Sequence, residues 1–84
     1  NEQGANVKLY PNPIAHSVES VTIEMAGIHR KIVTTLTDLS GRILKSNTFN
    51  EVQSFQLPIT ASSGLYLLVI DTETGRSVIQ LVKE

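Results

Sequence analysis

Gly64-Leu65-Tyr66-Leu67-Leu68-Val69-Ile70, followed by Asp71, is a run in which both alternating faces of a strand are apolar. Strands of this kind lie in the middle of a sheet, because both of their faces have to be covered. Thr72-Glu73-Thr74-Gly75 then has the composition of a turn, and residues 77–83 return as a last strand. We therefore expect the C-terminal part of the chain to form a β-hairpin whose first strand is central and packed on both sides.

Elsewhere the apolar residues recur mostly with a spacing of two, which is typical of strands and not of helices. This spacing predicts strands over residues 18–25 and 30–37, and it places Ile32 and Leu36 on one face of the second strand. Gly27 stands between the two segments. Because glycine adopts a positive φ without steric cost, we expect it to break the chain there.

Asp38-Leu39-Ser40-Gly41 is the clearest turn in the sequence, with Asp38 opening it and Gly41 closing it in a left-handed conformation. A strand over residues 42–46 then returns antiparallel. Another strand, around residues 55–57, ends at Pro58 because proline cannot donate to a ladder.

The N-terminal stretch is Val7-Lys8-Leu9-Tyr10-Pro11-Asn12-Pro13. Its first four residues predict a short strand. Pro11 and Pro13 lack an N–H and fix φ, so they fit at a sheet edge but not in a central ladder. We expect this stretch to lead rigidly into the domain.

Together these segments predict about seven short strands joined by turns. The expected fold class is an all-β, immunoglobulin-like antiparallel β-sandwich, and a small closed barrel is the alternative that the same pattern permits. With 84 residues, 40% of them hydrophobic, the chain is long enough for one domain with its own core. We assign residues 7–84 to that domain and residues 1–6 to a linker from a preceding domain, because the chain begins like a piece of a longer protein.

The charge balance narrows the class of partner. Lysine and arginine total 7 and aspartate and glutamate total 8, so a net charge of −1 offers no field for binding nucleic acid or acidic lipid. No apolar run reaches the roughly 18 residues of a membrane-spanning helix, so we expect no transmembrane segment. The chain has no cysteine, which excludes disulfides and thiolate metal sites.

Catalytic chemistry finds little support in the sequence. Ser17, His16 and Asp38 could form a triad on paper, but no motif places a nucleophile, a base and an orienting group together. We expect the protein not to be an enzyme. His29 stands beside Arg30 in a polar stretch, and we interpret it as a solvated turn residue.

No metal or cofactor is expected either. The acidic residues form no Asp-x-Asp cluster, and the two histidines lack ligand spacing; the acidic residues considered are Glu24, Asp38, Asp71 and Glu73. A calcium site on the loops is the remaining alternative. The glycines are scattered singly, so they form no phosphate cradle.

Tyr66 has two interpretations. It is a core aromatic whose hydroxyl reaches the backbone, or it belongs to a docking surface on the last hairpin. We prefer the first, because Leu68 and Ile70 share its face of the strand.

Four short elements follow one another along residues 7–84. They are Leu-Tyr-Pro-Asn-Pro, an Asp turn with a Gly-Arg pair, a Gly-x-Tyr strand and a short terminal strand. In this order and spacing the chain resembles the type A C-terminal sorting domain of the type IX secretion system, also called the Por secretion system C-terminal domain. The resemblance implies that the motif and recognition residues are Leu9, Tyr10, Pro11, Asn12, Pro13, Asp38, Gly41, Arg42, Gly64, Tyr66, Val82, Lys83 and Glu84.

The resemblance implies an address and not a reaction. The chain would direct an N-terminal passenger from the periplasm through the type IX secretion system, across the outer membrane to the cell surface or the medium. Its partners would be the secretion machinery and a sortase-type protease that commonly removes the domain. We expect docking on a free edge of the terminal hairpin and on a polar tip at Lys83 and Glu84, because an unpaired strand accepts another strand.

Two alternatives remain open. The chain could be a retained anchor or a structural component of the secretion machinery, which needs the same fold. It could also be a carbohydrate-binding or spacer module of a secreted enzyme. A carbohydrate module needs exposed aromatic rings, and the candidates are Tyr10, Phe49 and Phe55.

Overall fold

The computed structural model describes residues 7–84, which form one antiparallel sheet of five strands. The strands are β1 (Lys8–Tyr10), β2 (Ser20–Asp38), β3 (Ile43–Pro58), β4 (Gly64–Thr72) and β5 (Gly75–Lys83). Their order is β1-β2-β4-β5, and β3 pairs with the other side of β2. The prediction of an all-β antiparallel fold is confirmed. The assignment of residues 1–6 to a linker lies outside the described residues.

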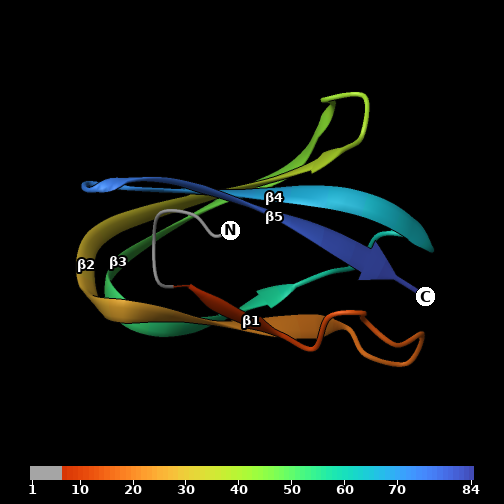
Figure 1. The fold of residues 1–84 in the computed structure, drawn as a ribbon, viewed down its shortest axis with the longest axis horizontal. Coiled ribbons are helices and arrows are strands. Elements are labelled where there is room, and N and C mark those ends of the chain that lie inside the picture. Colours follow the sequence, from red (N-terminus) through yellow and green to blue (C-terminus); the bar gives the residue numbers. More distant parts are fainter. Residues whose placement is uncertain (1–6) are drawn as a thin grey trace.

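The long strand β2 organises the sheet by changing neighbours along its length. Its first part pairs with β1 and with the end of β3, and its second part pairs with β4 and with the start of β3. Between these parts, residues 25–28 of β2 face the single residue 53 of β3. An excess of residues on one strand bends it. Figure 1 shows β2 and β3 curving there, so that β4 and β5 lie over β1 and the first part of β2.

The same irregularity keeps the apolar side chains inside. Val21 and Ile23 are buried before the bend, whereas Ile32 and Leu36 are buried after it. The buried positions therefore change from odd to even numbers across the bend, as they must when one strand has an odd number of extra residues there. Both parts of β2 thus contribute to one core, which consists of Ile14, Val21, Ile23, Met25, Ile32, Leu36, Phe55, Leu57, Ile59, Tyr66, Leu68, Ile70 and Leu81.

The number of strands differs from the expected seven. Gly27 does not break the chain, because the extra residues around it are absorbed in the bend of a continuous β2. Likewise the segments at 42–46 and 55–57 belong to the continuous strand β3. The immunoglobulin-like arrangement and its barrel alternative stay predictions.

Strand β4 is central, as its sequence predicted, because it pairs with β2 and with β5. Its two faces are not equally covered. Leu68 and Ile70 are buried in the core, but Leu67 and Val69 on the other face are only half-buried and Leu65 is 42% exposed. Among residues 7–84 there is no helix long and apolar enough to span a membrane.

Candidate recognition surface

Segments far apart in the sequence meet at one end of the sheet. Gly64 is the ladder partner of Lys83, and Asp38 is the ladder partner of Tyr66. Ile14, just beyond the second proline, forms an isolated parallel bridge with Lys83. Figure 1 shows the C-terminus, the start of β4 and the connection between β1 and β2 at this same end. The structure therefore brings together all four elements on which the resemblance was based.

Asn12 joins the N-terminal element to the last strand. Its side-chain Nδ2 donates a hydrogen bond of 2.9 Å to the carbonyl oxygen of Gln80, and its Oδ1 accepts one of 3.2 Å from the N–H of Val82. These partners fix the orientation of the amide, because a flipped group would place donor against donor. The side chain thus occupies the position that a peptide group of a neighbouring strand would take.

Ile14 continues this contact with its main chain. Its N–H donates to the carbonyl of Val82 at 2.6 Å, and its carbonyl accepts from the N–H of Glu84 at 2.8 Å. The side chain of Ile14 is fully buried in the core. We call residues 11–14 the clasp segment and residues 80–84 the tail. The prediction of a free edge along the terminal hairpin is wrong for the tail, because the clasp segment covers that edge.

Lys83 is not part of an exposed polar tip. The residue is 9% exposed, and its Nζ donates to the main-chain carbonyl of Val18. In β5 it has the same inward direction as Leu81, which is fully buried. Glu84 is exposed. The two residues that we expected to act together therefore have different surroundings.

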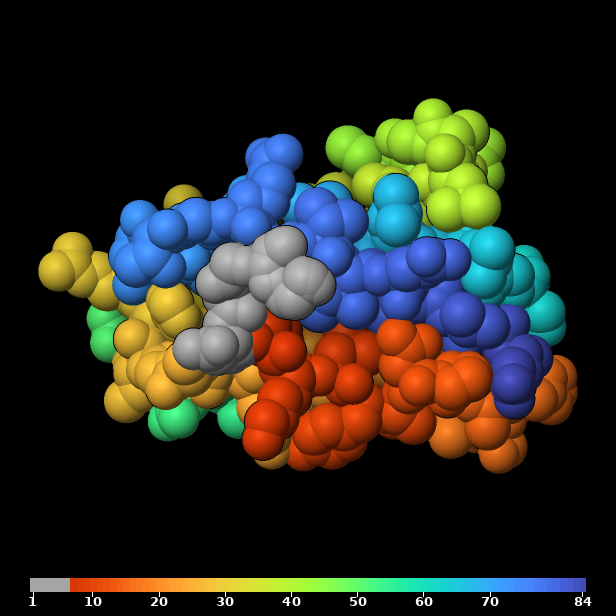
Figure 2. Space-filling view, viewed as in Figure 1, coloured from red at the N-terminus to blue at the C-terminus, as the bar shows by residue number. Residues whose placement is uncertain are grey.

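Figure 2 shows the dark-blue tail packed beside the orange segment that follows β1. The remaining residues of the N-terminal element flank the clasp. Leu9 is half-buried against the core, and the exposed hydroxyl of Tyr10 donates to Glu24 Oε2 at 2.6 Å. Pro11 and Pro13 are exposed, and the peptide bonds before them are cis.

Asp38 holds the predicted turn through its carboxylate. The Oδ1 atom accepts hydrogen bonds from Ser40 N at 3.0 Å, Ser40 Oγ at 2.6 Å and Arg42 N at 3.0 Å. These bonds, that of the Ser40 hydroxyl foremost, hold the pKa of Asp38 below its usual range. Gly41 has a φ of 94°, which confirms the left-handed conformation at this position. The Arg42 side chain is 77% exposed and points its Nε to Asp38 Oδ2 at 3.6 Å.

Tyr66 is a core residue with a satisfied hydroxyl. Its ring is buried, and its hydroxyl donates to the carbonyl of Ser62 at 2.6 Å. Gly64 has a φ of 151°, and a Cβ at that position would lie 3.7 Å from the tyrosine hydroxyl oxygen. The structural interpretation of Tyr66 is confirmed.

Two cavities open between these elements. One has a volume of about 360 Å³ and is lined by residues that include Asp38, Arg42 and Tyr66. The other, of about 440 Å³, is lined by residues that include His16 and Lys83. Both are bordered by Thr60, Ala61 and Ser62. The loop before β4 is therefore the wall that the two cavities share.

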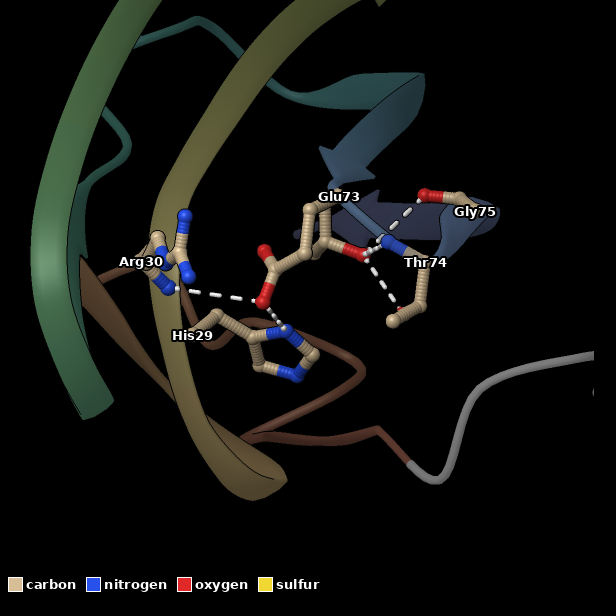
Figure 3. Close-up of polar contacts among 6 residues, drawn as sticks. His29, Arg30, Glu73, Thr74 and Gly75 are labelled. Atoms are coloured by element: carbon tan, nitrogen blue, oxygen red, sulfur yellow. Dashed lines mark hydrogen bonds and ion pairs between the residues drawn. The ribbon is translucent and has the colours of Figure 1, made fainter.

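His29 lies away from this end, in the bend of β2. Its side chain is 15% exposed, and its Nδ1 is 3.3 Å from Glu73 Oε2 in the turn between β4 and β5. The same oxygen is 3.5 Å from the N–H of Arg30 (Figure 3). The interpretation of His29 as a solvated turn residue is wrong, because the residue lies within β2 and most of its side chain is shielded from solvent.

The residues weighed for a catalytic triad or a metal site can be placed within residues 7–84. The contacts of Asp38 stay within residues 38–42 and its ladder partners, and do not reach the suggested triad partners His16 and Ser17. Within the described part of the chain, no three His, Cys, Asp or Glu side chains gather to hold a metal ion.

Comparison with protein families gives one match. The family model described as a secretion system C-terminal sorting domain matches residues 8–84, which include all four elements. Comparison with curated proteins and with solved structures found no match. The matched range includes both the clasp segment and the tail.

Proposed function

The chain belongs to the family of secretion system C-terminal sorting domains, and we propose that it is the address by which the type IX secretion system exports an N-terminal passenger. In this role the passenger crosses the outer membrane to the cell surface or the medium, and the machinery binds this domain. The chain itself carries out no reaction.

One observation carries this proposal. The four elements that resemble the family lie at one end of the sheet, where the clasp segment, the Asp38 turn, the loop before Gly64 and the tail adjoin one another. Elements spread over the whole sequence have no need to share one end if they serve only local folding. A common recognition surface accounts for their arrangement.

We further propose that a sortase-type protease separates the domain from its passenger after export. A retained anchor, or a component of the machinery, would use the same surface without that cleavage. The carbohydrate-binding alternative gains no support from the aromatic residues. Phe55 is buried, and its ring stacks on Phe49 with centroids 4.2 Å apart, which leaves Tyr10 alone and bonded to Glu24.

A deletion experiment tests whether the domain is needed. A passenger with its signal peptide is produced in a bacterium that has a type IX system, with and without this chain at its C-terminus. We expect the passenger with the chain at the surface or in the medium, and the passenger without it in the periplasm. Equal export of both proteins would contradict the proposal. The size of the exported passenger reports cleavage separately.

A further inference from the structure

We propose that Asn12 is a positioning residue that holds the tail in the strand conformation recognised by the secretion machinery. This inference rests on the proposed function of the chain. It assigns to residues 9–13 a role in presenting the tail, and not a surface of their own.

The tail lies at an edge of the sheet, where a strand has a neighbour on one side only. Strand β4 pairs with one side of it. On the other side, the groups of Gln80, Val82 and Glu84 that face outward are bonded by Asn12 and Ile14. Edge groups without such partners exchange protein hydrogen bonds for water, and terminal residues then fray. The clasp segment therefore decides whether the end of β5 stays on the sheet.

Asn12 suits this task because its amide has both a donor and an acceptor. The donor meets a carbonyl and the acceptor meets an N–H, two residues apart on one strand. An aspartate has the same shape but no donor when it is ionised. Serine or alanine is too short to span both groups. The chemistry of the site thus selects asparagine among side chains of its size.

The contact between the clasp segment and the tail also links the two ends of the domain. Asn12 and Val82 are 70 positions apart, so the contact ties the segment next to the passenger to the opposite end of the chain. Closing a loop of this length costs entropy, and the cost is least when the rest of the sheet already holds the two segments close together. The machinery would then meet an ordered tail only on a folded domain.

The test uses the passenger fusion with Asn12→Ala, Asn12→Asp and, as a matched control, Asn50→Ala. Asn50 is an exposed asparagine in β3. Hydrogen exchange of the Val82 and Glu84 amides is measured beside that of Leu68 in the core, and export is measured in the same strains. For Asn12→Ala we expect exchange of the Val82 amide to rise about tenfold, as the loss of one hydrogen bond predicts, with Leu68 unchanged. Export should fall several-fold, and Asn50→Ala should behave as the unaltered fusion.

Asn12→Asp adds a readout that a general loss of packing would not move. Ionised, the new carboxylate repels the Gln80 carbonyl, and below the pKa of the acid its O–H donates to that carbonyl again. The exchange of the Val82 and Glu84 amides in this variant, taken relative to the unaltered chain, should therefore decrease as the pH falls through about 4.

Three results would overturn the inference. They are unchanged exchange at Val82 in Asn12→Ala, equal acceleration at Leu68, and faster exchange of the tail with normal export. Failure of the unaltered fusion to leave the periplasm is a different result, because it contradicts the proposed function and not the role of Asn12.

Discussion

The ammonium group of Lys83 donates a hydrogen bond to the main-chain carbonyl of Val18, 65 positions earlier in the chain. This bond attaches the end of β5 to the connection between β1 and β2. It lies on the inward-facing side of the tail, where Lys83 is buried. Together with Asn12 and Ile14, it holds the tail from more than one direction. A basic residue near the C-terminus is thus a structural anchor in this domain.

Lys83→Ala should therefore destabilise the domain, whereas Glu84→Ala should not. Loss of the ammonium leaves the Val18 carbonyl without its partner, which costs about 1 to 3 kcal/mol. An exposed substitution such as Glu84→Ala stays within about 0.5 kcal/mol. Urea unfolding of the two variants measures the difference, and Lys83→Met separates the lost bond from the lost side-chain stem. Coincident midpoints for Lys83→Ala and Glu84→Ala would show that the anchor carries no stability.

Gly64→Val should cost more stability than Ser62→Ala. The φ of 151° at Gly64 is closed to a β-branched residue, and forcing it costs about 1 to 3 kcal/mol. Ser62 contributes its carbonyl and not its hydroxyl to Tyr66, so its side chain is dispensable. Gly75→Val is the matched control. Gly75 has a φ of 153° but no atom within 4 Å of its would-be Cβ, so this variant measures the cost of the backbone conformation without a neighbouring side chain. Equal unfolding midpoints for Gly64→Val and Ser62→Ala would refute the claim that the backbone conformation at residue 64 requires glycine.

Tyr66→Phe should lower the unfolding free energy by about 0.5 to 1.5 kcal/mol, because it removes the hydrogen bond to Ser62 and keeps the ring. Tyr10→Phe removes a hydroxyl with a bond of the same 2.6 Å length, but this bond is exposed to water. We expect the second variant to lose less. Thermal unfolding of both variants gives the comparison. A larger loss of unfolding free energy in Tyr10→Phe would contradict the claim that the Tyr66 hydroxyl contributes more to stability.

Acid should destabilise the domain partly through Asp38. The pKa of this carboxyl is lowered in the folded state by the Ser40 hydroxyl and the Arg42 N–H. A group whose pKa is lowered by folding adds stability above its unfolded pKa, and this stability is lost as the pH falls through the folded value. Asp38→Asn keeps the acceptor oxygen but does not titrate, so its stability should fall less steeply below about pH 4. If the stability of Asp38→Asn and that of the unaltered domain fell in parallel with pH, Asp38 would not be a cause of the acid destabilisation.

Much of this end of the fold was predictable from local sequence. Alternation placed Ile32 and Leu36 on one face, and both are buried. The composition of residues 38–41 gave the turn and the left-handed Gly41, because these depend on near neighbours. The burial of Tyr66 followed from the residues on its face of the strand.

Contacts between distant segments were not predictable in this way. Gly27 was expected to end a strand, but its conformation depends on how β3 opposes residues 25–28. Asn12 gave no sign of its partners, because they lie at the other end of the chain. Lys83 did carry a signal, since it alternates with Leu81 toward the core, and its charge obscured that pattern.

The most direct measurement is a transfer of the address to an unrelated protein. A reporter with a signal peptide and residues 7–84 at its C-terminus is produced in two strains that differ only in an intact type IX system, and its exposure is measured by protease digestion of whole cells. The account predicts a digestible or released reporter in the intact strain and a protected, periplasmic reporter in the defective one. A reporter that stays protected in both strains, or that is exposed in both, would contradict it.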